Sequence, residues 1–214
     1  LSSGKGIINA LKNLGHDVIA IDFNPENLIQ IIEKLKQCEL VFIGLHGKQG
    51  EDGTVQGILD LLHIPYVGSG VLASSLAMDK TRAKHIFEYH QIPVAYSQTY
   101  RSNEDKALIK ADILAHFELP VVIKPNQEGS TLGLSIVKEE AELLNGIEMA
   151  QNRDENILVE QYIKGRELTV AVLGTVGQEK ALPIIEIVPK NDYYDYESKY
   201  SEGGSVHLVP AEID

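Results

Sequence analysis

The chain has 214 residues with 43% hydrophobic content, enough to bury a substantial core in one or two domains of a soluble globular protein. Its formal net charge of −12 argues against nucleic acid and anionic membranes as partners, because both require a basic surface. The sequence shows neither a membrane span nor a targeting signal, and its single cysteine allows no intrachain disulfide, so we expect a cytoplasmic protein.

The first third of the chain alternates helical and strand patterns, which is typical of an open, mostly parallel sheet. Apolar residues at helical spacing predict an initial helix, with Ser3 as a candidate cap and Gly15 as its stop. The elements expected next are a strand at 17–22, a helix at 25–37 and a strand at 39–45. The second strand ends at His46 in a Gly-containing turn, and open α/β sheets bind ligands at the carboxyl ends of their strands. Glu51 and Asp52 fit the first turn of a following helix, where the helix dipole favours acids.

From about residue 70 the pattern changes to helices and then to a compact α+β lobe. The expected elements are helices at 71–77 and 80–90, a strand near 96–101 and a helix at 103–117. Residues 120–150 read as strand, loop, strand and helix, and residues 156–161 as a further strand. Antiparallel strands at 167–173 and 182–188 indicate a third unit.

The most informative segment is a β-branched strand, residues 121–123, that leads Lys124 into a polar loop. Two hydroxyl residues and two glycines make this loop suitable for an anion: Ser130, Thr131, Gly129 and Gly133. The lysine precedes the glycines and residues 135–137 look like a returning strand, so the pattern differs from the Walker motif. We interpret the segment as a hairpin flap over the phosphates of a nucleotide. An ordinary hairpin with a solvated lysine is the alternative.

Six other segments carry distinctive motifs. They are LSSGK at 1–5, LHGKQGEDGTVQG at 45–57, PYVGSGVLAS at 65–74, AMDK at 77–80, VEQYIKGRE at 159–167 and YDYESKY at 194–200. In this order and register, together with the flap, they resemble the D-alanine:D-alanine ligases of the ATP-grasp superfamily. The resemblance spans nearly the whole chain, and its specificity lies in the number of motifs that agree.

The resemblance implies an ATP-grasp fold of the α/β class, with an N-terminal open, mostly parallel sheet domain and α+β nucleotide-binding lobes. We expect an N-terminal substrate domain at 1–69, a central lobe with the phosphate flap at 70–158, and part of a C-terminal lobe with a lid at 159–214. Relative to the family pattern, the chain opens after the first strand and stops before the magnesium ligands. We therefore expect a fragment of a ligase, inactive by itself, with no metal ligand inside it.

The implied activity is the ATP-dependent ligation of two D-alanine molecules through an acyl phosphate, for peptidoglycan synthesis. ATP and Mg²⁺ are the implied cofactors, D-alanine and ATP the substrates, and a homodimer the implied assembly. By resemblance, two lysines contact the phosphates, one glutamate and one backbone N–H contact the adenine, and a second glutamate contacts the ribose. The residues implied to bind ATP are Lys80, Lys124, Glu160, Ile163, Glu167 and Tyr194.

A tyrosine-rich loop at 190–204 is typical of a lid over a reactive intermediate. In the family, the tyrosine matching Tyr200 hydrogen-bonds the serine matching Ser130, and the lysine matching Lys199 reaches the transferred phosphate. His46 is expected near the first amino acid. The lid motif favours the dipeptide ligase over a D-alanine:D-lactate or D-alanine:D-serine ligase. It also argues against the remaining alternative, a non-catalytic ATP-binding module.

Overall fold

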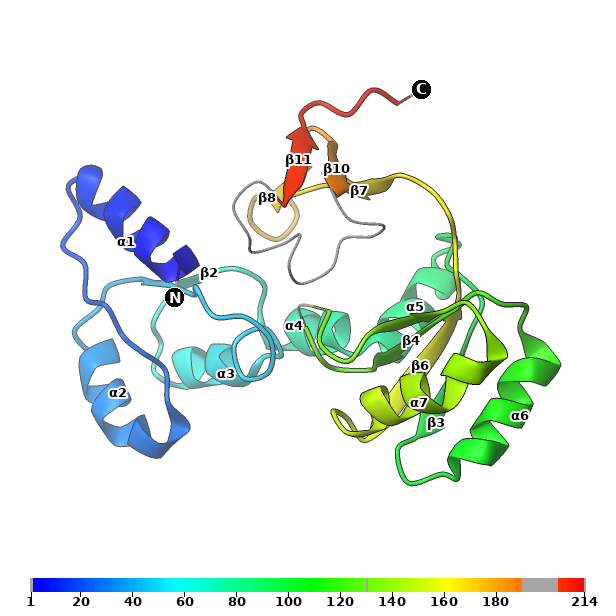
Figure 1. Ribbon diagram of the computed structural model, residues 1–214. Coiled ribbons are helices and arrows are strands. Elements are labelled where there is room, and N and C mark those ends of the chain that lie inside the picture. The colour runs from blue at the N-terminus through cyan, green and yellow to red at the C-terminus, as the bar shows by residue number, and fades with distance from the viewer. Residues whose placement is uncertain (1, 130, 190–203, 214) are drawn as a thin grey trace. The chain divides into compact units, whose positions relative to one another are not determined.

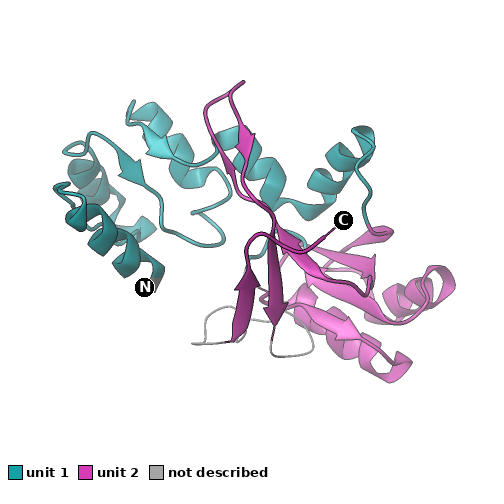
Figure 2. Cartoon of the chain, turned by 90° about the horizontal axis from the view of Figure 1, so that it is seen from above, with its two compact units in different colours: residues 1–94, 126–129 teal, residues 95–125, 130–214 magenta. Residues whose placement is uncertain are grey.

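A computed structural model describes residues 2–129, 131–189 and 204–213 of the chain (Figure 1). The chain forms two units, residues 1–94 with 126–129 and residues 95–125 with 130–214 (Figure 2). Each unit has a hydrophobic core of its own. Four residues of a later loop therefore belong to unit 1, although the strand before them belongs to unit 2. Among the described residues, no helix combines the length and apolar character needed to cross a membrane.

Unit 1 is built from short helices around one parallel strand pair. Its elements are α1 (Ser2–Asn13), the 3-10 helix η1 (Pro25–Asn27), α2 (Leu28–Leu35), β1 (Val41–Phe42), α3 (Thr54–Leu61), β2 (Tyr66–Val67), α4 (Val71–Met78) and α5 (Lys80–Tyr89). Strand β1 pairs with β2 in parallel, as expected for an α/β arrangement. The buried residues of α2 and α3 form the core with Ile64 between them. The helices predicted around residues 25–37, 71–77 and 80–90 are thus confirmed.

Three local predictions for unit 1 are wrong. Residues 17–22 form no strand, because a strand requires a hydrogen-bonded neighbour and none pairs with this segment in the described part of the chain. Ile21 nevertheless packs against the core, so the apolar pattern reflects burial of an extended segment. The strand expected at 39–45 is only β1. Ser3 lies inside α1 instead of capping it, whereas Gly15 ends the helical region with a φ of 87° as predicted.

In unit 2, a four-stranded antiparallel sheet carries two helices on one face. The strands, in sheet order, are β3 (Ser97–Arg101), β6 (Asn156–Gln161), β4 (Val121–Pro125) and β5 (Ser135–Val137). The helices are α6 (Lys106–His116) and α7 (Leu143–Gln151), the latter preceded by the 3-10 helix η2 (Glu140–Glu142). Alternate residues of β4 and β6 pack against both helices in one core. The strand and the returning strand predicted within 120–137 are confirmed as the antiparallel pair β4 and β5.

The rest of unit 2 contains β7 (Glu167–Thr169), β8 (Val172–Leu173), β9 (Lys180–Ala181), β10 (Ile185–Pro189) and β11 (Ser205–Leu208). These form an antiparallel sheet in the order β11-β10-β7 and a separate β8-β9 hairpin. The strand predicted at 167–173 is therefore divided into β7 and β8, and the strand predicted at 182–188 corresponds to β10, which begins only at Ile185. Between the two ladders, residues 170–171 lie opposite residues 182–184, and Pro183 has no N–H with which to continue the pairing.

Candidate active site

The strand before the flap carries a cation that is paired with a carboxylate on the neighbouring strand. Lys124 lies opposite Leu158 and Val122 lies opposite Glu160, so Lys124 and Glu160 are diagonal neighbours on one sheet face. Their side chains form an ion pair between Nζ and Oε2, and they are only 20% and 13% exposed. Ile123, between the two outward positions of β4, is buried in the core on the helix side. The face away from the helices therefore presents a positive and a negative group side by side.

Lys80, the first residue of α5, is held by the start of the loop that follows β4. Its Nζ donates to the carbonyl oxygens of Asn126 at 3.2 Å and Glu128 at 2.7 Å, and its backbone N–H donates to the Asn126 carbonyl at 3.2 Å. Residues 126–129, which we call the loop base, belong to unit 1 together with α5. The loop base thus fixes the position of a second lysine.

A buried carboxylate anchors this arrangement. Asp79, only 3% exposed, caps α5 by accepting from the backbone N–H of Arg82 at 3.0 Å. It also accepts from the side-chain amides of Asn126 at 2.9 Å and Gln127 at 3.0 Å, and it pairs with the Arg82 guanidinium. Asn126 Oδ1 in turn accepts from the backbone and hydroxyl of Thr81, at 2.9 and 2.8 Å. Burial by itself would raise the pKa of Asp79, but these hydrogen bonds outweigh it and lower the pKa to about 2.

The turn that follows β1 brings His46 close to two polar side chains. His46 Nε2 lies 3.2 Å from the Ser3 hydroxyl, and Nδ1 lies 3.9 Å from Glu51 Oε1. The other oxygen of Glu51 accepts from the Gly47 N–H at 2.6 Å. Asp52 accepts backbone N–H groups on both sides of the turn, and these hydrogen bonds lower its pKa against the opposing effect of burial. Glu51 and Asp52 thus shape the turn before α3, whose N-cap is Gly53, instead of lying in its first turn.

The remaining predicted site residues are not brought together in the described part of the chain. Ile163 is exposed in the segment after β6, and Glu167 begins β7 in register with Ile187. Four predicted residues lie outside the described residues: Ser130, Tyr194, Lys199 and Tyr200. The contacts described above thus unite Lys124 with Glu160, and Lys80 with the loop base.

Two clusters were missed from the sequence. Asp79 stands directly before a helix, a position that favours aspartate, and this signal could have identified it as a cap. Arg166 forms a bidentate pair with Glu186 and donates to the Glu212 carbonyl at 2.7 Å. Glu186 is buried between apolar neighbours of β10, and an acid inside an apolar strand is itself a sign of a paired charge.

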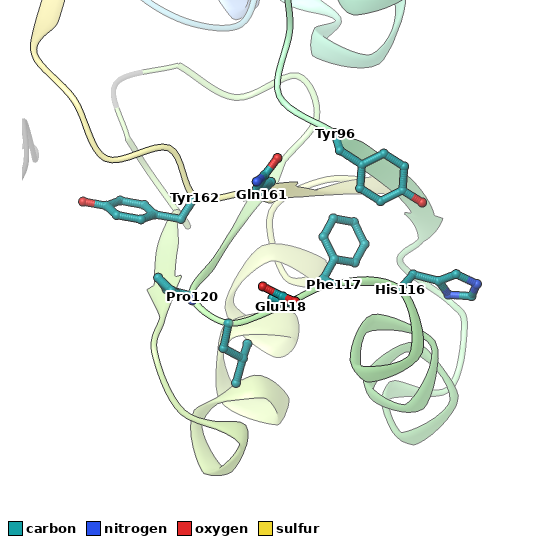
Figure 3. Close-up of a pocket in the computed structure, with 8 residues that line it drawn as sticks. Tyr96, His116, Phe117, Glu118, Pro120, Gln161 and Tyr162 are labelled. Atoms are coloured by element: carbon teal, nitrogen blue, oxygen red, sulfur yellow. The ribbon is translucent and has the colours of Figure 1, made fainter.

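A pocket of about 410 Å³ lies elsewhere in unit 2 (Figure 3). Tyr96 stacks at its edge on Phe117, with ring centroids 5.0 Å apart, and Tyr162 lies at the opposite side. Gln161, which also lines it, follows Glu160 on β6 and so points to the other face of the sheet. None of the predicted site residues lines this pocket, which is therefore distinct from the Lys124–Glu160 pair.

Comparison with known proteins gives one consistent family. The family model for the D-ala D-ala ligase C-terminus matches residues 86–214, and that for the D-ala D-ala ligase N-terminus matches residues 23–69. The D-alanine--D-alanine ligase of Halalkalibacterium halodurans is 54% identical over 218 residues, with 100% of this chain and 68% of the relative covered. The corresponding protein of Geotalea uraniireducens is 44% identical, with 100% of this chain and 66% of the relative covered.

Solved structures agree with this result. The D-alanine--D-alanine ligase from Bacillus anthracis complexed with ATP has a TM-score of 0.76 and 32% identity, with 100% of this chain and 65% of that chain covered. The VanG D-Ala:D-Ser ligase from Enterococcus faecalis has a TM-score of 0.71 and 40% identity, covering 82% of this chain and 51% of that chain. The fold is thus that of the ATP-grasp ligases.

The chain belongs to the D-alanine–D-alanine ligase family. It spans about two thirds of the length of the curated relatives that it matches.

Proposed function

We propose that the protein carrying this chain joins two D-alanine molecules into D-alanyl-D-alanine and converts ATP to ADP and phosphate. The observation that carries the proposal is the Lys124–Glu160 pair, placed beside the Gly-containing flap in a member of this family. A partly buried ammonium beside a carboxylate offers a donor for phosphate oxygens and an acceptor for an amino group. ATP carries both kinds of group.

The proposed nucleotide contacts divide between phosphate and nucleoside. Lys124 exchanges its carboxylate partner for phosphate oxygens, and Lys80 adds a second positive charge from the start of α5. Glu160 accepts from the adenine amino group, while the backbone N–H of Ile163 donates to the ring. Glu167 binds the ribose hydroxyls.

The proposed reaction has two steps. A carboxylate oxygen of the first D-alanine attacks the terminal phosphorus of ATP, and the bond between this phosphorus and the bridging oxygen breaks to release ADP. The amine of the second D-alanine then attacks the carbonyl carbon of the acyl phosphate, phosphate leaves with its bonding electron pair, and the nitrogen loses its extra protons. Lys124 and Lys80 stabilise the negative charge that develops during the first step.

The remaining assignments follow the family. His46, oriented by Glu51, lies beside the first amino acid. Tyr194, Lys199, Tyr200 and Ser130 belong to the lid and flap, which shield the acyl phosphate from water. The product serves peptidoglycan synthesis, and the enzyme is a cytoplasmic homodimer.

We propose that magnesium binds together with the ATP phosphates. Within the described ranges, no three His, Cys, Asp or Glu side chains gather in a way that could hold a metal ion. We therefore assign no magnesium ligand to these residues. In this part of the site, Lys80 and Lys124 neutralise the negative charge of the phosphates.

The proposal is tested by following ADP release and dipeptide formation by the intact ligase. We expect ADP release that depends on D-alanine, with one D-alanyl-D-alanine formed per ADP. A protein that binds ATP but releases ADP at the background rate in the presence of D-alanine would be a binding module, and the proposal would be wrong.

A second candidate follows from the 40% identity with the VanG D-Ala:D-Ser ligase. The discriminating measurement is product analysis with D-alanine, D-serine and D-lactate present together. We expect D-alanyl-D-alanine to dominate. A mixed product with D-serine in excess would instead assign the chain to a D-alanine:D-serine ligase.

A further inference from the structure

Glu128 makes two contacts that lead to different parts of the candidate site. Its carboxylate Oε1 lies 2.9 Å from Lys48 Nζ, and Lys48 belongs to the turn that carries His46. Its backbone carbonyl accepts from Lys80 Nζ at 2.7 Å. One residue of the loop base therefore joins a phosphate-side lysine to the turn beside the proposed amino-acid site.

The same two segments also meet through their backbones. A Cβ atom placed on Gly129 would lie 3.3 Å from the Gly47 Cα and 3.6 Å from Glu51 Oε2. The loop base and the turn at 46–51 are therefore in direct contact, and only a residue without a side chain fits at Gly129 without displacing its neighbour.

The Lys48–Glu128 ion pair is partly shielded from solvent but lies outside the hydrophobic core. The Lys48 side chain is 45% exposed, so water and salt weaken the attraction at that end of the pair. The Glu128 side chain is only 19% exposed and is largely protected from solvent. Neither residue belongs to the hydrophobic core of unit 1. The pair is thus suited to adjust the position of a loop, and its loss leaves the core packing intact.

We propose that Glu128 and Lys48 are positioning residues that couple amino-acid binding to nucleotide binding. Binding of an amino acid fixes the conformation of the turn at 46–51. Lys48 and Gly47 of this turn then hold the loop base in place, and the Glu128 carbonyl holds Lys80 at the phosphate position. This inference rests on the proposed function. Since such coupling is reciprocal, D-alanine raises the affinity for ATP by the factor by which ATP raises the affinity for D-alanine.

The test measures the affinity of the intact ligase for a non-hydrolysable ATP analogue, with and without saturating D-alanine. Glu128→Gln and Lys48→Met remove one charge each, and the combination of both removes the pair. We expect each single variant to reduce the D-alanine-dependent gain in affinity about two- to fivefold, the range of a partly exposed ion pair. The double variant should lose no more than either single variant.

Rescue and control variants separate positioning from folding. The exchanged pair, Lys48→Glu with Glu128→Lys, should restore at least half of the lost gain. Lys110→Met breaks a surface ion pair with Glu140 in unit 2 and should leave the gain unchanged. Thermal unfolding of all variants is followed in parallel.

Two results would overturn the inference. Single-variant losses that add independently in the double variant, or an exchanged pair that folds normally yet restores nothing, would show that the contact does not couple the two ligands. Both outcomes are interpreted only after D-alanine-dependent ADP release has been measured for the wild-type enzyme. Absence of that release in the wild type would overturn the proposed function itself, and the coupling with it.

Discussion

Asp79 is buried and Lys124 is partly buried, and their charges are compensated in different ways. Asp79 in unit 1 accepts from three different residues, two of them in the loop base, and its pKa falls to about 2. Lys124 in unit 2 is matched by the Glu160 carboxylate across a sheet face that no helix of its core covers. A carboxylate enclosed by protein donors serves the structure. We propose that Lys124, which is balanced by a carboxylate on the neighbouring strand, serves a ligand.

This comparison predicts that the two sites fail differently when they are altered. Loss of Asp79 should lower the free energy of unfolding, because the buried side-chain amide of Asn126 loses its acceptor. Loss of Lys124 should lower catalysis more than stability, since the lysine becomes most important when a phosphate replaces its carboxylate.

Replacing Asp79 with alanine should give the largest effect. The substitution removes the acceptor shared by the Arg82 backbone N–H and the side-chain amides of Asn126 and Gln127. Asn126 is almost fully buried, and a buried donor that loses its acceptor typically costs about 1–3 kcal/mol, so we expect a loss of about 3 kcal/mol. Urea unfolding measures the loss. Asp17→Ala, at an exposed aspartate, is the control and should change stability by less than about 0.5 kcal/mol. Similar losses in the free energy of unfolding for the two variants would show that Asp79 has no special structural role.

Lys124→Ala should reduce kcat/KM for ATP in the intact ligase about a hundredfold, because it removes a charged contact that strengthens as phosphate charge develops. Steady-state kinetics measure the loss. Lys110→Ala is the matched control, since it also removes a lysine from an ion pair with a glutamate in unit 2. If both variants keep wild-type kinetics, Lys124 is an ordinary sheet lysine and the comparison fails.

The depressed pKa of Asp79 predicts a specific acid sensitivity. Its folded-state pKa of about 2 lies below the ordinary value of 3.8, so the stabilisation is present above pH 4 and is lost as the pH falls towards 2. Over this range the wild type should lose about 2 kcal/mol more than Asp79→Asn, which cannot titrate there. Urea unfolding across the pH series isolates this difference. Parallel curves would mean that the hydrogen bonds do not perturb the carboxyl group.

Gly133→Ala should give the smallest effect of the series. Gly133 has a φ of 74°, and an added Cβ would lie 2.9 Å from the Pro125 Cγ and 3.1 Å from the Arg153 Cγ. The left-handed backbone alone costs an alanine roughly 1–2 kcal/mol. Gly165→Ala is the control, because no atom lies within 4 Å of its Cβ position. Equal stability of the two variants would show that the end of the flap tolerates a side chain.

The sequence predicts best what depends on neighbouring residues. Helical periodicity identified α3, α4 and α5, and the β-branched run with its glycines identified β4 and the return of the chain into β5. The strand expected at 17–22 failed because a strand exists only with a partner, which a local pattern cannot supply. The assignment of α6 was right in kind, but the helix begins at Lys106 with Asp105 as its cap.

The sequence indicates candidate residues for the site one by one, but it does not indicate the contacts between them. The sequence indicates Lys80, Lys124 and Glu160 as separate candidates. Lys124 and Glu160 are 36 residues apart, and their pairing depends on the register of β4 against β6. The bond between Asp79 and Asn126 spans 47 residues and depends on how the loop returns to unit 1. The roles of Ser130, Tyr194, Lys199 and Tyr200 stay predictions.

The return of residues 126–129 to unit 1 sets a limit on how this chain can be divided. A recombinant piece that ends at Val94 contains every helix of unit 1 but lacks the two amides that hold Asp79. Such a piece keeps the contacts of Asp79 with Arg82 but lacks its two amide donors, and it should therefore be less stable than the same unit in the intact chain. Adding the tetrapeptide Asn126–Gly129 through a short linker after Val94 would restore these donors. This compact unit is thus discontinuous in the sequence.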